Sequence, residues 1–204
     1  MLHSEKRRNM KDLIKLLFGK IKNGNGFKIK FTDKDLAGIK CYKIKELKAS
    51  IQEKKNNIEI PEVRGIYFVG QVDKAKSLPV LEKSSMPKSK ARAKWYGKDV
   101  LERVLKESQD KRILYIGKTD AKKGLKERIS AYIRYINKAN KVTGAHNGGR
   151  SIWQLKGADA LDFCWIPMEK ITDDPGIKAE DIEKALIGAY WELYRNYPFA
   201  NRRL

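Results

Sequence analysis

The chain has 204 residues with 45 Lys or Arg against 25 Asp or Glu, which gives a formal net charge of +20 and a pI near 9.8. This length fits one domain with additions, and 41% hydrophobic with 9% aromatic residues argues against a disordered chain. No apolar run approaches the roughly 18 residues that cross a bilayer, and no secretory signal core follows the charged first residues, so we expect no membrane association.

The excess of positive charge predicts a polyanionic partner. It exceeds what solubility requires, and charge alone allows nucleic acid or an anionic membrane surface. A lysine-rich surface without such a partner is the alternative. The two cysteines, Cys41 and Cys164, lie far apart in the sequence, so we expect reduced thiols, no disulfide and a cytoplasmic location.

Residues 1–60 are expected to form a basic N-terminal extension. Apolar residues at helical spacing predict a helix over 10–21. The Asn and Gly residues of 23–26 predict a turn, because both residue types tolerate positive φ. Over 27–31, apolar residues alternate with lysines, which predicts a half-buried strand. A lysine-rich helical or mixed segment follows up to residue 55.

Two apolar, β-branched runs follow, and each carries a Tyr beside a Gly. The runs cover 65–69 and 113–116 and predict buried strands. A buried phenol hydroxyl needs a polar partner, so Tyr67 and Tyr115 indicate hydroxyls that face a polar site. Between the runs, residues 71–97 are rich in Lys, Ser and Pro and predict a long basic loop that leads into a short amphipathic helix.

The remaining elements alternate between helix and strand. We expect a helix over 125–141, a loop at 147–149, a third strand near 161–165 and a last helix after Pro175. This order predicts an α+β fold with a small, mainly antiparallel, three-stranded central sheet flanked by helices.

The segments Gly65-Ile66-Tyr67 and Tyr115-Ile116-Gly117 resemble the two motifs of the GIY-YIG nuclease family. The resemblance covers about residues 63–203, which is most of the chain. It implies the GIY-YIG fold over a nuclease domain at 61–204. The long insertion at 71–97 then departs from the family, in which a short connection joins the two motif strands.

The resemblance also implies roles for residues that follow the motifs in the family's order. Tyr67 is the expected general base near the attacking water, and Tyr115 is expected to orient that water or the scissile phosphate. Lys118 is expected to assist deprotonation. Arg128 is expected to bind the phosphate, with Tyr132 one helical turn later on the same face. Taken alone, Arg128 and Tyr132 fit an ordinary solvated Arg beside a partly buried Tyr better than a catalytic pair, and their order after the two motifs favours the catalytic pair.

Glu183 is the candidate metal ligand, because the family's acidic ligand lies on a helix just before an apolar Leu-Ile pair. Glu180 and Glu192 on the same predicted helix are the alternatives. A single carboxylate predicts weak binding of a largely hydrated Mg²⁺, with Mn²⁺ able to substitute. Asn201, after a Pro-containing turn, resembles the family's late asparagine, for which we expect a structural hydrogen-bonding role near the site.

The expected function is therefore a Mg²⁺-dependent endonuclease that hydrolyses phosphodiester bonds in double-stranded DNA. Its compact size is most like a stand-alone type II restriction endonuclease. Because each chain would carry one site and must cut two strands, a homodimer or a transient pairing is expected. Two alternatives remain open: a structure-specific repair or mobile-element nuclease, and a catalytically silent DNA-binding module.

Overall fold

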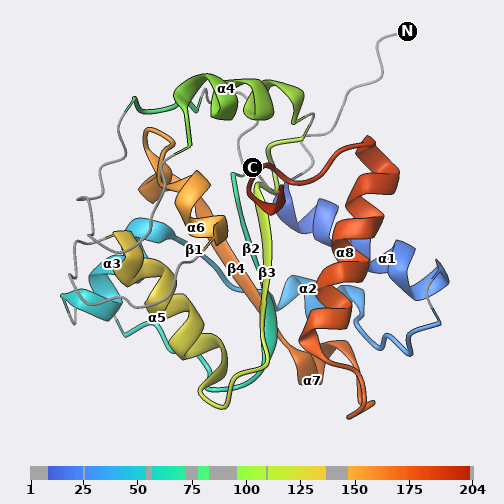
Figure 1. The fold of residues 1–204 in the computed structure, drawn as a ribbon. Coiled ribbons are helices and arrows are strands. Elements are labelled where there is room, and N and C mark those ends of the chain that lie inside the picture. The colour runs from blue at the N-terminus through green and yellow to red at the C-terminus, as the bar shows by residue number, and fades with distance from the viewer. Residues whose placement is uncertain are drawn as a thin grey trace, which may run out of the picture.

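A computed structural model describes residues 9–24, 26–53, 57–71, 78–82, 96–108, 110–136 and 147–202. Its centre is a four-stranded antiparallel sheet flanked by helices, so the fold is α+β (Figure 1). The strands are β1 (Cys41–Lys43), β2 (Gly65–Gly70), β3 (Tyr115–Thr119) and β4 (Asp162–Pro167), in the spatial order β1-β4-β2-β3.

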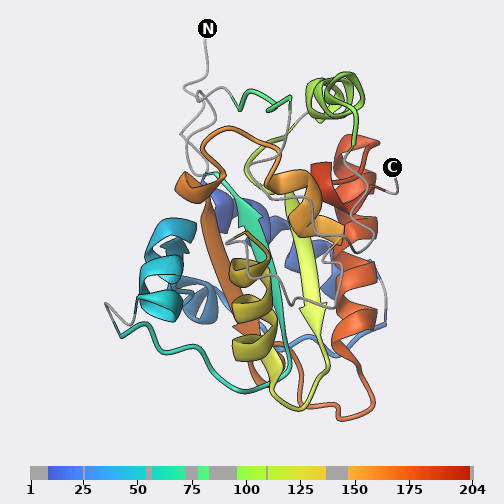
Figure 2. The same ribbon diagram turned by 60° about the vertical axis from the view of Figure 1, so that its left-hand side comes forward.

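Two hydrophobic cores lie on opposite faces of this sheet. Neighbouring residues of a strand point to opposite faces, so Ile66 and Phe68 enter one core and Tyr67 and Val69 the other. Every residue of β2 is buried, which explains its unbroken apolar sequence. Figure 2 shows α5 in front of the sheet and α1 behind it.

Helices fall into two groups according to the core that they complete. The core around Ile66 and Phe68 is completed by α1 (Met10–Gly24), α2 (Asp33–Ala37), α7 (Met168–Ile171) and α8 (Ala179–Tyr194). The core around Tyr67 is completed by α3 (Ile44–Gln52), α4 (Lys98–Glu107), α5 (Gly124–Ile136), α6 (Asn147–Ile152) and the short 3-10 turns η1 (Ala158–Ala160) and η2 (Phe199–Asn201).

The prediction of three strands is wrong, because β1 adds a fourth. β1 has only three residues in a lysine-rich segment, and it pairs with β4 across a long stretch of chain. The predicted strand over 27–31 is also wrong. Ile29 and Phe31 are buried and Lys28 and Lys30 are exposed, as a half-buried strand requires, but this segment is not a strand and lies on the core outside the sheet.

The predicted loop at 147–149 is wrong as well, because α6 begins at Asn147. The helix predicted over 125–141 is present as α5, while residues 137–146 lie outside the described residues. Most of the predicted basic loop at 71–97 also lies outside them. Within its described part, Val80 forms a β-bridge with Leu155.

The described residues before 61 pack directly onto the rest of the chain. Leu13, Ile14 and Leu17 of α1 belong to the same core as the central strands, and β1 is hydrogen-bonded to β4. The domain boundary at 60/61 stays a prediction.

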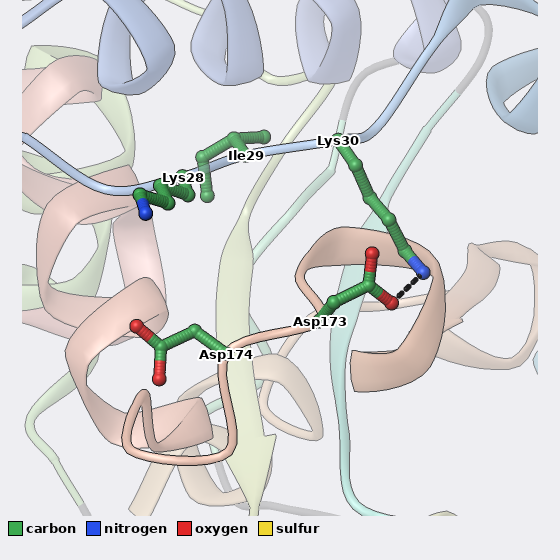
Figure 3. A pocket seen from close by; sticks show the side chains of 5 residues that line it. All are labelled: Lys28, Ile29, Lys30, Asp173 and Asp174. Carbon is green, nitrogen blue, oxygen red and sulfur yellow. Dashed lines mark hydrogen bonds and ion pairs between the residues drawn. The ribbon is translucent and has the colours of Figure 1, made fainter.

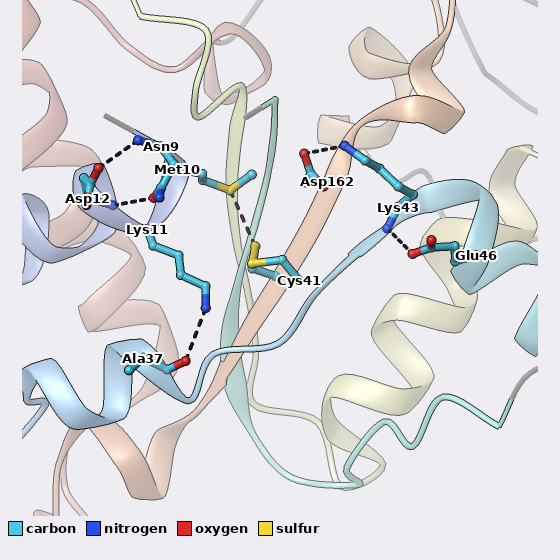
Figure 4. The surroundings of a disulfide bond; sticks show 10 residues. Asn9, Met10, Lys11, Asp12, Ala37, Cys41, Lys43, Glu46 and Asp162 are labelled. Carbon is cyan, nitrogen blue, oxygen red and sulfur yellow. Dashed lines mark hydrogen bonds and ion pairs between the residues drawn. A yellow bond between two sulfur atoms is a disulfide. The ribbon is translucent and has the colours of Figure 1, made fainter. Parts of the chain in front are cut away.

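Cys41 and Cys164 form a disulfide bond, so the expectation of reduced thiols is wrong (Figure 4). The two residues stand directly opposite each other in the β1–β4 pair, with their Cα atoms 4.3 Å apart. A separation of 123 positions gave no sign of this pairing in the sequence. The ion pair of Lys43 with Asp162, at 2.8 Å, lies beside it. Stable disulfides are uncommon in a reducing cytosol, so the bond removes one reason for a cytoplasmic location.

Within the described parts of the chain, none of the helices has the length and apolar character needed to cross a bilayer.

Candidate active site

Tyr67 of the first motif lies against Gly117 of the second. The two residues are opposite each other in the β2–β3 pair. A Cβ atom on Gly117 would come within 2.3 Å of Tyr67 Cζ and 2.5 Å of its hydroxyl oxygen. A glycine at this position therefore leaves the space that the Tyr67 phenol fills.

Gly117→Ala is expected to destabilise the fold by about 2 kcal/mol, because the added methyl group would overlap the Tyr67 ring in a packed core. Gly188→Ala is the matched control, since Gly188 lies inside α8 with nothing within 4 Å of an added Cβ, and alanine there should stabilise by about 0.5 kcal/mol. Urea unfolding of both variants checks this. A Gly117→Ala protein as stable as wild type would contradict the packing argument.

Tyr115 completes a pair of tyrosines. Its ring centroid lies 5.8 Å from that of Tyr67 in an edge-to-face arrangement, and both side chains are buried. Each phenol is among the groups that shift the pKa of the other. Gly148 of α6 packs on the Tyr115 ring, since a Cβ on Gly148 would come within 2.3 Å of Tyr115 Cε2. The tyrosines of the two motifs therefore form one polar group inside the core.

Arg128 of α5 reaches this group. Its Nε donates a hydrogen bond to the Tyr67 hydroxyl at 3.3 Å. Burial raises the pKa of Tyr67, while the charge and the hydrogen bond of Arg128 oppose that rise. Burial raises the pKa of Tyr115 well above its usual value, with further increases from Tyr67 and Glu183. Both phenols are therefore neutral near pH 7. The charge of Arg128 favours both phenolates, and its hydrogen bond favours that of Tyr67 in addition.

Glu183 approaches the same group from α8. Its side chain is half-buried, and burial raises its pKa to about 7, against the opposing charges of Lys118 and Arg128. The charge of Glu183 in turn raises the pKa values of Tyr67 and Tyr115. Tyr67, Tyr115 and Arg128 thus meet in one place, and Glu183 of α8 is near enough for its charge to act on them.

The alternative carboxylates of α8 have other partners. Glu180 forms ion pairs with Lys118 at 3.4 Å and with Lys184 at 2.8 Å, and its side chain is 45% exposed. Glu192 pairs with Lys20 of α1 at 3.3 Å and is 61% exposed. Of the three carboxylates, Glu183 is among the largest influences on the pKa values of both tyrosines.

Lys118 is held between two carboxylates. Its Nζ lies 3.2 Å from Asp120 and 3.4 Å from Glu180. Burial lowers the pKa of Lys118, but these two partners outweigh burial and raise it above its usual value. Lys118 is therefore a fixed positive charge at neutral pH, and its predicted help in deprotonation stays a prediction.

Tyr132 lies in the hydrophobic core. It is fully buried, with its ring 5.8 Å from that of Trp153 and 5.2 Å from that of Phe163. Burial raises its pKa well above the usual value, with a smaller effect from Tyr67. Tyr132 therefore supports the site from inside the core, on the same helix as Arg128.

Asn201 binds the backbone of β3. Its Oδ1 accepts from Ile116 N–H at 2.8 Å, and its Nδ2 donates to Ile116 C=O at 2.7 Å. The geometry agrees with the structural, hydrogen-bonding role expected from the sequence. The amide of Asn201 thus holds the strand that carries Tyr115.

Asp120, directly after β3, is a site residue that sequence reasoning missed. Its carboxylate pairs with Lys118 and also binds the first backbone amides of α8, 59 positions further along the chain. A carboxylate directly after the second motif strand was the only signal in the sequence.

The donor set suits a divalent cation held by one carboxylate. Among the described residues, no group of three or more His, Cys, Asp or Glu side chains could hold a metal. The half-buried Glu183 offers an oxygen ligand, and burial makes its anion costly without a nearby cation. Hard cations such as Mg²⁺ prefer oxygen ligands and keep most of their water. A single half-buried carboxylate is compatible with a weakly held, largely hydrated Mg²⁺, and a Mg²⁺ at Glu183 is part of the proposal below.

A hollow of about 440 Å³ lies elsewhere on the molecule, between the segment before α2 and the loop after α7 (Figure 3). It is lined by Lys28, Ile29, Lys30, Asp173 and Asp174, and Lys30 and Asp173 form an ion pair. None of the predicted site residues lines it.

The chain matches no protein-family model, and comparisons with curated proteins and with solved structures also give no match. The interpretation of the site therefore depends on its own geometry and chemistry.

Proposed function

We propose that the protein is a Mg²⁺-dependent endonuclease of the GIY-YIG type that hydrolyses phosphodiester bonds in double-stranded DNA. One observation carries the proposal. Tyr67 contacts both Tyr115 and Arg128, which come from separate elements, and the charge of Glu183 on α8 acts on all three. Residues of these types, in this order along the chain, are what the resemblance implies.

Each residue has a chemical task in this proposal. Arg128 binds the scissile phosphate and offsets the charge that develops on it. Tyr67 first loses its own proton to solvent, a loss that Arg128 makes less costly, and the resulting phenolate takes a proton from the attacking water. Tyr115 orients the water or phosphate through its hydroxyl. Glu183 would hold the Mg²⁺, which polarises the phosphate when bound.

The positive charge of the chain supports DNA as the partner. Most of the excess Lys and Arg belongs to sequence segments outside the described residues, including 83–95. Contacts between Lys or Arg side chains and DNA phosphates supply affinity without sequence selectivity. We propose a stand-alone type II restriction endonuclease acting as a homodimer or through transient pairing. A cytoplasmic location follows from this activity, because the DNA substrate would lie there, and no longer from the cysteines.

The proposal is tested by incubating the purified protein with supercoiled and linear plasmid DNA, in Mg²⁺, Mn²⁺ or EDTA. Discrete fragments in Mg²⁺ and intact DNA in EDTA are expected. Cutting only at branches or lesions would assign the protein to repair or to a mobile element. Salt-sensitive binding without cutting, in every metal tried, would leave a DNA-binding module.

Glu183→Gln is expected to be more stable than wild type at pH 8 but not at pH 4. The folded pKa of Glu183, about 7, lies above the ordinary value of 4.5. Stability from its neutral form is therefore fully present below pH 4.5 and is lost as the pH rises through 7. Gln stays neutral, so its gain at pH 8 without divalent cations should be about 2 kcal/mol.

Urea unfolding at both pH values measures this difference. The exposed Glu192→Gln is the control and should differ from wild type by the same small amount at both pH values. Mg²⁺ at pH 8 should raise the Tm of wild type and leave that of Glu183→Gln unchanged. Equal stability of wild type and Glu183→Gln at pH 8 would show that Glu183 is not a buried anion.

A further inference from the structure

The first turn of α8 is capped by a residue at the end of β3. The residue before this helix, Lys178, carries only hydrogen-bond donors on its side chain and cannot cap the helix. Instead, Ala179 N–H donates to Asp120 Oδ1 at 2.8 Å, and Glu180 N–H donates to Asp120 Oδ2 at 3.3 Å. Asp120 thus satisfies two of the backbone amides that every helix start leaves without an intrahelical partner.

The same carboxylate also holds a lysine. Lys118 Nζ lies 3.2 Å from Asp120 Oδ2 and 3.4 Å from Glu180 Oε2, and the side chains of Lys118 and Asp120 are each 30% exposed. The end of β3 is therefore joined to the start of α8 twice, by the backbone hydrogen bonds to Asp120 and by the ion pair of Lys118 with Glu180. Glu183 follows Glu180 by three positions, so both lie on the same face of the helix.

We propose that Asp120 is a positioning residue for the cleavage reaction. By joining the start of α8 to the end of β3, it fixes where Glu183 stands relative to Tyr67 and Tyr115. Asp120 acts through the helix and not on the DNA. The inference depends on the proposed nuclease function and names a residue that the resemblance does not include.

Replacing Asp120 separates positioning from binding. Asp120→Ala removes the two capping hydrogen bonds at the start of α8 and one partner of Lys118. We expect kcat to fall about 30-fold, since misplacing a catalytic group by roughly 1 Å can cost 100-fold in rate. KM for plasmid DNA should change less than about 2-fold, because the DNA contacts remain. Asp120→Asn keeps an oxygen that can accept from Ala179 N–H, and should recover kcat to within about 3-fold of wild type.

Asp181→Ala is the matched control, because Asp181 accepts a hydrogen bond from Lys178 N–H at 3.0 Å within the same first turn. Both alanine variants should lower Tm by about 3 °C. Only Asp120→Ala should lower kcat. Equal losses of kcat in the two variants, or no loss in Asp120→Ala, would overturn the positioning role.

NMR of the backbone amides tests the same role without any cleavage assay. In Asp120→Ala, amide shifts should change both in β3 and around Glu183, whereas Asp181→Ala should change only the first turn of α8. If wild type cuts no DNA, the nuclease proposal fails. The NMR comparison still decides whether Asp120 fixes the position of Glu183. An unchanged environment of the Glu183 amide in Asp120→Ala would overturn the inference.

Discussion

We expect Glu183→Gln to lower the rate of DNA cleavage by about 10³-fold or more. Glutamine keeps the volume and polarity of the side chain, but it removes the negative charge beside Arg128 and the tyrosines. A neutral amide is a weak ligand for a hard cation, so the phosphate would lose the polarisation proposed for the metal. Loss of a single well-placed electrostatic group in an active site commonly costs 10² to 10³-fold.

Plasmid cleavage under single-turnover conditions measures this effect, with two controls on the same helix. Glu192→Gln, on the α1 side of α8, should cut at the wild-type rate. Glu180→Gln should lose little, because Glu180 is exposed and is paired with two lysines. If Glu180→Gln abolished cleavage while Glu183→Gln retained it, the metal ligand would have to be reassigned to Glu180.

We also expect Asp110→Ala to destabilise the fold by about 4 kcal/mol. Asp110 and Arg112 are both about 5% exposed, and Arg112 Nε lies 3.0 and 2.9 Å from the two oxygens of Asp110. Tyr194 O–H also donates to Asp110 Oδ2 at 2.8 Å, and Tyr190 O–H donates to the Asp110 carbonyl. Alanine would leave the Arg112 guanidinium buried without its counter-ion, a loss that typically costs 3 to 5 kcal/mol.

The pKa of Asp110 agrees with this view. Burial raises it, but the hydrogen bonds from Arg112 and Tyr194 outweigh burial and bring it below its ordinary value. Asp173→Ala is the control, since Asp173 pairs with Lys30 at a position that is 83% exposed, and its loss should stay within about 0.5 kcal/mol. Urea unfolding near pH 7 compares the variants. A loss below about 1 kcal/mol for Asp110→Ala would mean that the pair is not needed for stability.

Local patterns in the sequence predicted what depends on local chemistry. The apolar runs containing Tyr67 and Tyr115 form β2 and β3, and the spacing of Ile182 and Leu186 gives the buried face of α8. The positions of Arg128 and Glu183 on helices followed in the same way. Their convergence beside the tyrosines is visible only in the structure, because it depends on contacts between elements distant in sequence.

The features that the sequence did not predict depend on long-range packing. β1 and its disulfide need the register that places Cys41 opposite Cys164. At α6, Asn and the two glycines favour a turn, yet the helix packs closely on the Tyr115 ring through Gly148. Tertiary contacts override local propensity there. Asp120 was missed for the same reason, since its partners at the start of α8 are far along the chain.

The contact of Asn201 with Ile116 has a consequence for how two copies of the chain could meet. β3 lies at one edge of the sheet, and an open edge offers its N–H and C=O groups to a strand of another molecule. Here the Asn201 amide occupies both groups of Ile116, and Ala200 N–H takes the Leu114 carbonyl. The part of β3 next to Tyr115 is thus closed to edge-to-edge pairing with a partner copy.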